Sequence, residues 1–515
     1  MKKRLLQLIP VLQICAGFAG AQTSPATTAQ QRSHVERFST TEARAERVES
    51  ETSAKLATNP DDTEALNLRA LARMRFGHYQ QACDDLRRAV SLKPNVAAYQ
   101  ANLGFALWKL GRVDEAMTAE RAALKLDEKN FTANYQLGRF LLRSGKRDQV
   151  ADAVTYLRRA LELEPGQYDA RFELISAYRA LGDNAHATNQ LNLLKDARPS
   201  DPRVSYMSAV LATDRDDFES AIRDFKDALR RDPSLYNAWQ DLGLAYAKLK
   251  RWPDAVETFA ELASRQTGSV EAAYLHALSL LNAGRAGEAE PEVRRALRLN
   301  AGAAEAHTLL GVILASKGTA NVEAIESLSQ AIALTPASFD AHFYLGRVLY
   351  SMKDYSGAVR ELREAARLNP RRAETRFFLG TSLESAGESE AAMAEYQELI
   401  KIDSESAIGQ LGLGALLVKQ GRTTDAIAAL ERSIRLDPQN FESRWALGRA
   451  FVIANRFGEA VDALKSAVAI APNRADAHYQ LGLALRRLGR SEEAAQEFAI
   501  VERINTEFRT NTTKP

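Results

Sequence analysis

The sequence is poor in the residue types that build disulfide-stapled domains and metal clusters. Only two of its 515 residues are cysteine, Cys15 and Cys83, and Cys15 lies in the N-terminal leader discussed below. A disulfide framework and a zinc cluster built on cysteine pairs are therefore excluded. Aromatic residues make up only 7% of the chain, while alanine is frequent, which favours helices packed through small side chains.

The chain also lacks a clear excess of charge of either sign. Its formal net charge is +2, and three of its 68 basic residues lie in the leader, which leaves 65 basic against 66 acidic residues. We find no local basic stripe. Because no field of one sign surrounds the chain, we expect neither nucleic acid nor an anionic membrane surface as a partner.

No catalytic or phosphate-binding motif stands out in the sequence. It has no phosphate loop, nucleophile elbow or HExxH motif, and no two of its seven histidines stand three or four residues apart. We therefore predict no catalytic residues, no metal and no cofactor. The segments outside the repeats described below are too short for a catalytic domain, which argues against an enzyme.

The N-terminus, MKKRLLQLIPVLQICAGFAGAQ, begins with basic residues and continues with an apolar stretch from Leu5 to Ala19. Small residues follow, up to Ala21. This pattern predicts a signal peptide at 1–21 and an exported protein, periplasmic or extracellular. The apolar stretch is short and contains Pro10 and two glutamines. These features disfavour a permanent transmembrane helix. A membrane anchor formed by an uncleaved leader is the alternative to a cleaved signal peptide.

Internal repetition is the strongest signal from residue 63 onward. An alanine recurs every 34 residues, except for two steps of 37 and 35. These anchor alanines are Ala82, Ala116, Ala153, Ala187, Ala221, Ala255, Ala289, Ala324, Ala358, Ala392, Ala426, Ala460 and Ala494. A small residue stands about twelve positions before each anchor, except at Ile175, and a proline often follows twelve positions after it. This pattern predicts two closely packed helices in each unit, with a glycine turn between them and the proline at the end of the second helix.

This unit resembles the tetratricopeptide repeat, a helix–turn–helix of 34 residues. The sixth repeat fits the family pattern best, with Trp239, Leu242, Gly243, Tyr246, Ala255 and Phe259 in place. Thirteen repeats begin at Thr63, Ala97, Phe131, Tyr168, Pro202, Tyr236, Val270, Ala304, Phe339, Ala373, Ala407, Phe441 and Ala475. The resemblance implies an all-α fold, an α-solenoid of helix pairs forming a right-handed superhelix.

The predicted organisation has four parts. A signal peptide at 1–21 precedes a linker and N-terminal capping helix at 22–62. The thirteen repeats cover 63–508, and a polar tail occupies 509–515.

The resemblance also implies that the first helix of each repeat lines a concave groove that receives a partner. Position 5 of the repeat, which faces this groove in the family, is aromatic in eight repeats: Tyr135, Phe172, Tyr206, Tyr274, Phe343, Phe377, Trp445 and Tyr479. Position 9, one helical turn later, is arginine in three repeats: Arg139, Arg347 and Arg449. A ring beside an arginine offers an apolar surface and a forked donor for carboxylates. The alternative is that the rings pack against the next repeat and the arginines pair with acids such as Asp340 or Glu442.

The sequence therefore predicts a non-catalytic scaffold or adaptor that binds protein or peptide partners through its groove. The resemblance implies a place in the cell envelope. The alternatives are an accessory subunit of a polysaccharide-export, secretion or peptidase system, and a structural spacer. The histidines at position 4 of their repeats, His307, His342 and His478, are predicted to pack rather than to bind metal. The sequence indicates neither the partner nor the oligomeric state.

Overall fold

The computed structural model describes residues 42–318 and 321–512. These residues form 27 α-helices and no β-strand. The all-α solenoid of helix pairs expected from the sequence is confirmed, while its right-handed winding stays a prediction. The predicted signal peptide and the start of the predicted linker lie outside the described residues. None of the described helices combines the length and the apolar composition needed to cross a membrane.

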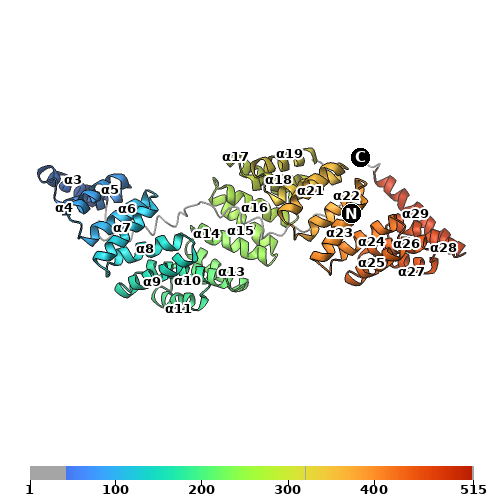
Figure 1. Ribbon diagram of the computed structural model, residues 1–515, viewed down its shortest axis with the longest axis horizontal. Helices are drawn as coiled ribbons and strands as arrows, with labels where there is room; N and C mark the ends of the chain where they lie inside the picture. The colour runs from blue at the N-terminus through green and yellow to red at the C-terminus, as the bar shows by residue number, and fades with distance from the viewer. Residues whose placement is uncertain (1–41, 319–320, 513–515) are drawn as a thin grey trace. The chain divides into compact units, whose positions relative to one another are not determined.

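The helices divide into two compact units, whose boundary lies between residues 267 and 268. The N-terminal unit holds a leading helix and six helix pairs, stacked in chain order (Figure 1). Its helices are α3 (Glu42–Thr58), α4 (Thr63–Arg75), α5 (Tyr79–Leu92), α6 (Ala97–Lys109), α7 (Val113–Leu126), α8 (Phe131–Arg143), α9 (Arg147–Leu163), α10 (Tyr168–Leu181), α11 (Asn184–Ala197), α12 (Pro202–Thr213), α13 (Phe218–Arg231), α14 (Tyr236–Lys248) and α15 (Trp252–Arg265).

The C-terminal unit holds seven helix pairs, and α29 continues past residue 508, where the predicted repeats end. Its helices are α16 (Val270–Asn282), α17 (Ala286–Leu299), α18 (Ala304–Lys317), α19 (Asn321–Leu334), α20 (Phe339–Ser351), α21 (Tyr355–Leu368), α22 (Ala373–Ser385), α23 (Ser389–Ile402), α24 (Ala407–Lys419), α25 (Thr423–Leu436), α26 (Phe441–Ile453), α27 (Phe457–Ile470), α28 (Ala475–Arg487) and α29 (Ser491–Thr512). In both units the first helix of every pair begins at the residue predicted to start a repeat.

Each repeat is held together at one close approach between its two helices. All thirteen anchor alanines of the second helices are buried, with exposed fractions of 2% or less. The small residue of the first helix stands opposite. A Cβ added at Gly346 would lie 2.6 Å from Leu362 Cγ and 3.3 Å from the carbonyl oxygen of Ala358. A larger side chain would force the helices apart, which confirms the predicted role of both small positions.

The turn between the two helices of each repeat contains one residue in the left-handed conformation. In nine repeats this residue is glycine, as the sequence predicts. In the other four repeats it is Asp216, Lys250, Lys353 or Asn455, with φ between 56° and 67°. The geometry of the turn is therefore kept even where the residue is not the one that adopts it most readily.

Position 4 of the first helix joins many of the repeats to the loop before them. In seven repeats its side chain bonds the backbone carbonyl oxygen six residues earlier: Asn134, Arg171, Trp239, His307, His342, Arg444 and His478. The position-4 histidines are thus part of the packing, as predicted. In five repeats the side chain at position 4 meets a polar side chain on the second helix: Arg171 with Gln190, Ser205 with Asp227, His342 with Glu361, Arg376 with Glu395, and His478 with Glu497.

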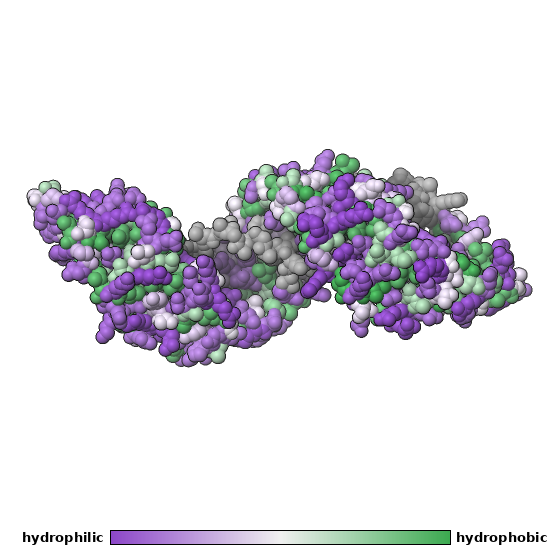
Figure 2. Space-filling model, in the orientation of Figure 1, coloured by the Kyte–Doolittle hydropathy of each residue, from purple (hydrophilic) through white to green (hydrophobic). Residues whose placement is uncertain are grey.

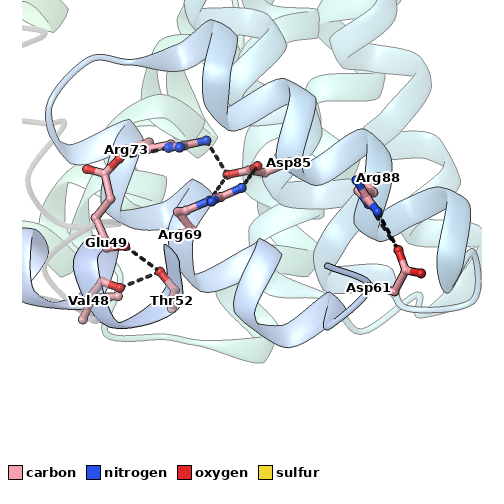
Figure 3. Close-up of polar contacts among 8 residues, drawn as sticks. All are labelled: Val48, Glu49, Thr52, Asp61, Arg69, Arg73, Asp85 and Arg88. Carbon is pink, nitrogen blue, oxygen red and sulfur yellow. Dashed lines mark hydrogen bonds and ion pairs between the residues drawn. The ribbon is translucent and has the colours of Figure 1, made fainter. Parts of the chain in front are cut away.

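The leading helix α3 is joined to the first repeat by a chain of ion pairs (Figure 3). Arg69 of α4 makes two hydrogen bonds, of 2.9 and 2.7 Å, to the buried carboxylate of Asp85 on α5. Arg73 donates to Asp85 at 2.7 Å and to Glu49 of α3 at 3.0 Å. Helix α3 therefore covers the first repeat in the place where the sequence predicts a capping helix.

Candidate binding surface on the first helices

Successive first helices contact one another within each unit, for example α6 with α8 and α26 with α28. We use the name first-helix face for the side chains at positions 5, 9, 12 and 13 of these helices, in each unit separately. One contact recurs between neighbouring repeats, in which position 5 or 9 of one repeat meets position 6 of the next. The hydroxyl of Tyr206, for example, donates to Asp241 at 2.9 Å.

The surface of both units is mostly hydrophilic on the side drawn in Figure 2, with hydrophobic residues in smaller areas. A partner on this side would therefore meet separate apolar contact points within a polar surface. For this reason the exposure of each aromatic side chain on the first-helix face decides what it can contact.

The eleven side chains predicted to line a groove fall into three groups by exposure. The buried group is Tyr135, Arg139, Phe172, Tyr274 and Phe343. The partly buried group is Tyr206, Arg347, Phe377, Trp445 and Arg449. Tyr479 alone among the eleven is exposed, at 48%. For the buried group, the environment is the one given by the alternative in which these side chains pack within the protein. Ligand binding by any of the eleven stays a prediction.

The three predicted pairs of an aromatic ring and an arginine do form. The guanidinium carbon lies 5.2 Å from the ring centre for Arg139 and Tyr135, 5.5 Å for Arg347 and Phe343, and 4.9 Å for Arg449 and Trp445. All three distances fall in the range of cation–π contacts. Residues four apart on these helices therefore lie side by side, as the helical period requires.

The three arginines differ in their other neighbours. Arg139 donates to Glu173 of the next repeat, with 3.1 Å between Nε and the carboxylate oxygen. Arg347 lies over the ring of Phe378, at position 6 of the next repeat, with 4.8 Å between its guanidinium carbon and the ring centre. Arg449 has no carboxylate within 4 Å among the described residues, and Glu442, a partner considered for it, lies instead 3.6 Å from Arg474.

The structure also gathers side chains that the repeat pattern does not single out. Three cations converge on the indole ring of Trp108, near the ends of α6 and α8 in the N-terminal unit. The distances to its ring centre are 4.8 Å for Lys109 Nζ, 5.1 Å for Arg139 Cζ and 5.0 Å for Arg143 Cζ. We use the name Trp108 cluster for Tyr79, Phe105, Trp108, Lys109, Arg139 and Arg143.

Electrostatics mark Lys109 as unusual in this cluster. Burial lowers the pKa of its ammonium group to about 8, and the nearby charges of Arg139 and Arg143 act in the same direction. A signal for the cluster exists in the sequence, because Lys109 and Arg143 both occupy position 13 of consecutive repeats, and the former follows Trp108 directly.

A pocket beside α21 in the C-terminal unit is lined by charged residues of both signs. Its arginines pair with acids: Arg360 with Glu361 at 2.9 Å, Arg363 with Glu388 at 3.1 Å and Arg367 with Glu364 at 2.6 Å. Glu361 also lies 2.8 Å from Nδ1 of His342, and this hydrogen bond raises the pKa of the imidazole. Because its arginines are paired, the pocket favours no ligand charge.

The stacked helix pairs define a repeat solenoid without a separate globular domain among the described residues. Family models described as tetratricopeptide repeat match residues 67–131, 206–270, 274–320, 323–359, 347–407, 411–475 and 471–506, and a further one matches 146–211. These matches cover more than half of the chain, so the protein belongs to the tetratricopeptide repeat family. Members of this family are typically non-catalytic scaffolds and bind protein or peptide partners.

Individual proteins are similar to parts of the chain. It is 27% identical over 204 residues to the peroxisomal targeting signal receptor of Saccharomyces cerevisiae, across 38% of this chain and 33% of the receptor. The match thus spans about a third of that relative's length. Among solved structures, the APC/C hetero-tetramer Cut9-Hcn1 is 15% identical over 92% of each chain, with a TM-score of 0.45. YrrB, described as a TPR protein with an unusual peptide-binding site, is 18% identical over 36% of this chain and 95% of its own, with a TM-score of 0.31.

Proposed function

We propose that the protein is a non-catalytic scaffold that binds protein partners through its first-helix faces. The observation that carries this proposal is a group of three accessible side chains on two contacting helices, Trp445 and Arg449 on α26 and Tyr479 on α28. Arg449 has no carboxylate partner among the described residues, and its guanidinium carbon lies 4.9 Å from the ring centre of Trp445. Aromatic rings and arginine are the residue types most enriched at the energetic centres of protein interfaces.

Photo-crosslinking in the cell that makes the protein tests this proposal. We would replace Tyr479 with a photo-crosslinking phenylalanine analogue, and place the same analogue at Lys401 as a matched control. Lys401 is exposed on the second helix α23, with 73% of its side chain accessible. We expect a defined crosslinked protein from the Tyr479 position and none from the Lys401 position.

The outcome separates the proposal from its alternatives. Crosslinks to the chain itself alone would support a structural spacer instead of a scaffold for other proteins. Equal crosslinking from both positions would contradict a specific role of the first-helix face. If the captured protein belongs to a secretion, polysaccharide-export or peptidase system, the scaffold would be an accessory subunit of that system.

We also propose that the protein is exported and acts in the cell envelope or outside the cell. The support is the N-terminal pattern at 1–21, with its basic start, short apolar stretch and small residues before Gln22. Mass analysis of the mature protein tests it. We expect an N-terminus at Gln22, and a protein in the cytoplasmic fraction that keeps Met1 or the whole leader would contradict export.

A further inference from the structure

We infer that the Trp108 cluster binds an acidic side chain, aspartate or glutamate, of a protein partner. The cluster lies on the first-helix face of the N-terminal unit, with Tyr79 added from the second helix α5. The inference therefore rests on the proposed function and adds the chemistry of one partner contact to it.

The first argument is the balance of charge. Three cations surround one indole ring, and only Arg139 has a carboxylate partner, Glu173 at 3.1 Å. Neither Lys109 nor Arg143 has a carboxylate within 4 Å in the part of the chain that the structure describes. Like charges this close repel one another, and an incoming anion would relieve that repulsion.

The second argument is the set of rings around the ammonium group of Lys109. Its Nζ lies 4.8 Å from the ring centre of Trp108, 5.5 Å from that of Phe105 and 5.9 Å from that of Tyr79. The rings occupy space that water would otherwise fill, so the ammonium group is partly desolvated. In such surroundings a hydrogen bond between an ammonium group and a carboxylate is stronger than in bulk water.

The third argument concerns the kind of anion. The rings offer contact for carbon atoms next to the ammonium group, and a small inorganic anion has no carbon atoms to place there. Arg143 is exposed at the edge of the cluster, so a second donor is accessible from solvent. A carboxylate carried on a short carbon chain satisfies both features, and an acidic side chain of a protein provides one.

The surroundings of Lys109 predict how the affinity for an acidic side chain depends on pH. The titratable and charged groups that face Lys109 are Tyr79 on α5 and Arg139 and Arg143 on α8, with Glu173 on α10 behind Arg139. Only the protonated amine attracts a carboxylate, and its pKa is about 8 in the unbound protein. Affinity should therefore be highest below that pH and fall as the pH rises through it.

The test uses the mature chain and two synthetic peptides with blocked ends, one with glutamates flanked by leucines and the other with glutamines instead. Binding is measured by fluorescence anisotropy at low ionic strength and pH 7. We expect the glutamate peptide to bind about tenfold more tightly than the glutamine peptide, as for a hydrogen bond to a charged group. Lys109→Met and Arg143→Met should each remove most of this difference.

Matched controls and a conservative variant complete the design. Lys125→Met and Arg121→Met change the same charges at exposed positions of α7, the second helix of repeat 2, and should leave the affinity unchanged. Lys109→Arg should keep the affinity and remove its dependence on pH near 8. Circular dichroism of every variant checks that the fold is intact, and Lys109→Arg tests the charge where Lys109→Met fails to fold.

Several outcomes would overturn the inference. These are no binding of the glutamate peptide, equal binding of both peptides, an equal loss in the α7 controls, and an unchanged pH profile in Lys109→Arg. A glutamine peptide with a free terminal carboxylate that binds as well as the glutamate peptide would overturn the assignment to a side chain. The proposed function would fail separately, since the crosslinking at Tyr479 probes the C-terminal unit.

Discussion

Repeats 3 and 12 carry nearly the same phrase, FTANYQLGRFL at 131–141 and FESRWALGRAF at 441–451, yet their arginines have different environments. Arg139 of repeat 3 is only 5% exposed, and its guanidinium donates to Glu173 on the first helix of repeat 4. It is thus part of the contact between two repeats.

Arg449 of repeat 12 is partly exposed and stacks on Trp445. Position 6 of the following repeat is Gln480 here, where repeat 4 has Glu173. The residue that decides the role of the arginine therefore lies in the next repeat, outside the shared phrase. A repeat motif takes its function from its neighbour as much as from its own sequence.

The largest effect should come from removing the acid that distinguishes the two copies. Glu173→Ala leaves the buried guanidinium of Arg139 without its carboxylate, which should lower the free energy of unfolding by about 3 kcal/mol. Gln480→Ala is the matched control beside Arg449 and should change it by less than about 0.5 kcal/mol. Urea denaturation measures both, with hydrogen exchange of α8 and α10 showing where the loss falls. Equal losses in the two variants would contradict a deciding role for position 6.

Repeat 2 departs from both copies at the close approach between its helices. Repeats 3 and 12 place Leu157 and Leu464 opposite the glycine of the first helix, whereas repeat 2 places Glu120 against Gly104. Glu120 is fully buried, and neither carboxylate oxygen has a hydrogen-bond partner. Burial holds the pKa of this carboxyl group well above its ordinary value.

We expect Glu120→Leu to raise the free energy of unfolding at neutral pH by about 2 kcal/mol, because it removes an unsatisfied buried polar group. The unfolded chain releases the glutamate proton at a lower pH than the folded chain does. Stability should therefore fall as the pH rises above the ordinary glutamate range, and this fall should be missing in the variant. Denaturation across a pH series measures it, with Glu162→Leu, exposed on α9, as the control. A variant with the parent's pH profile would show that Glu120 does not cause the fall.

The sequence was sufficient to predict the fold because each helix pair repeats the same small residues at the same spacing. The spacing of Gly346 and Ala358, for example, lies within one repeat. The start of each repeat could therefore be placed without a structure. The exposure of the site residues is not local. Tyr274 and Tyr479 share position 5, yet one is 1% exposed and the other 48%, since no further helix pair follows the repeat of Tyr479 among the described residues.

The Trp108 cluster was not predicted from the sequence, for a related reason. Its members come from three repeats, and only the packing of α5, α6 and α8 brings Tyr79, Trp108 and Arg143 together. A single-repeat pattern shows each of them as an isolated position. A search for cations at equal positions of consecutive repeats would have indicated Lys109 and Arg143.

Repeats 3 and 12 share the close approach between a glycine of the first helix and a leucine of the second. Overpacking at this approach should change the free energy of unfolding equally in both repeats. A Cβ added at Gly138 would lie 2.7 Å from Leu157 Cγ, and one added at Gly448 would lie 2.4 Å from Leu464 Cγ. We expect Gly138→Ala and Gly448→Ala each to destabilise by about 1 kcal/mol, because overpacking exceeds the gain in helix propensity. Thermal unfolding of both variants measures this. A stabilising effect in either one would contradict a close approach at that position.

The smallest effect should come from making repeat 12 resemble repeat 3. Gln480→Glu places a carboxylate at the position from which Glu173 reaches Arg139. Because Arg449 is partly exposed, the new pair should stabilise the protein by only about 0.3 kcal/mol, and high salt should remove the gain. Gln480→Leu, which adds no charge, should show no dependence on salt. The same Gln480→Glu variant should reduce crosslinking at Tyr479, since Arg449 would then be occupied within the chain. A gain that persists in high salt would come from packing, and the acid at position 6 would not be what separates the two copies.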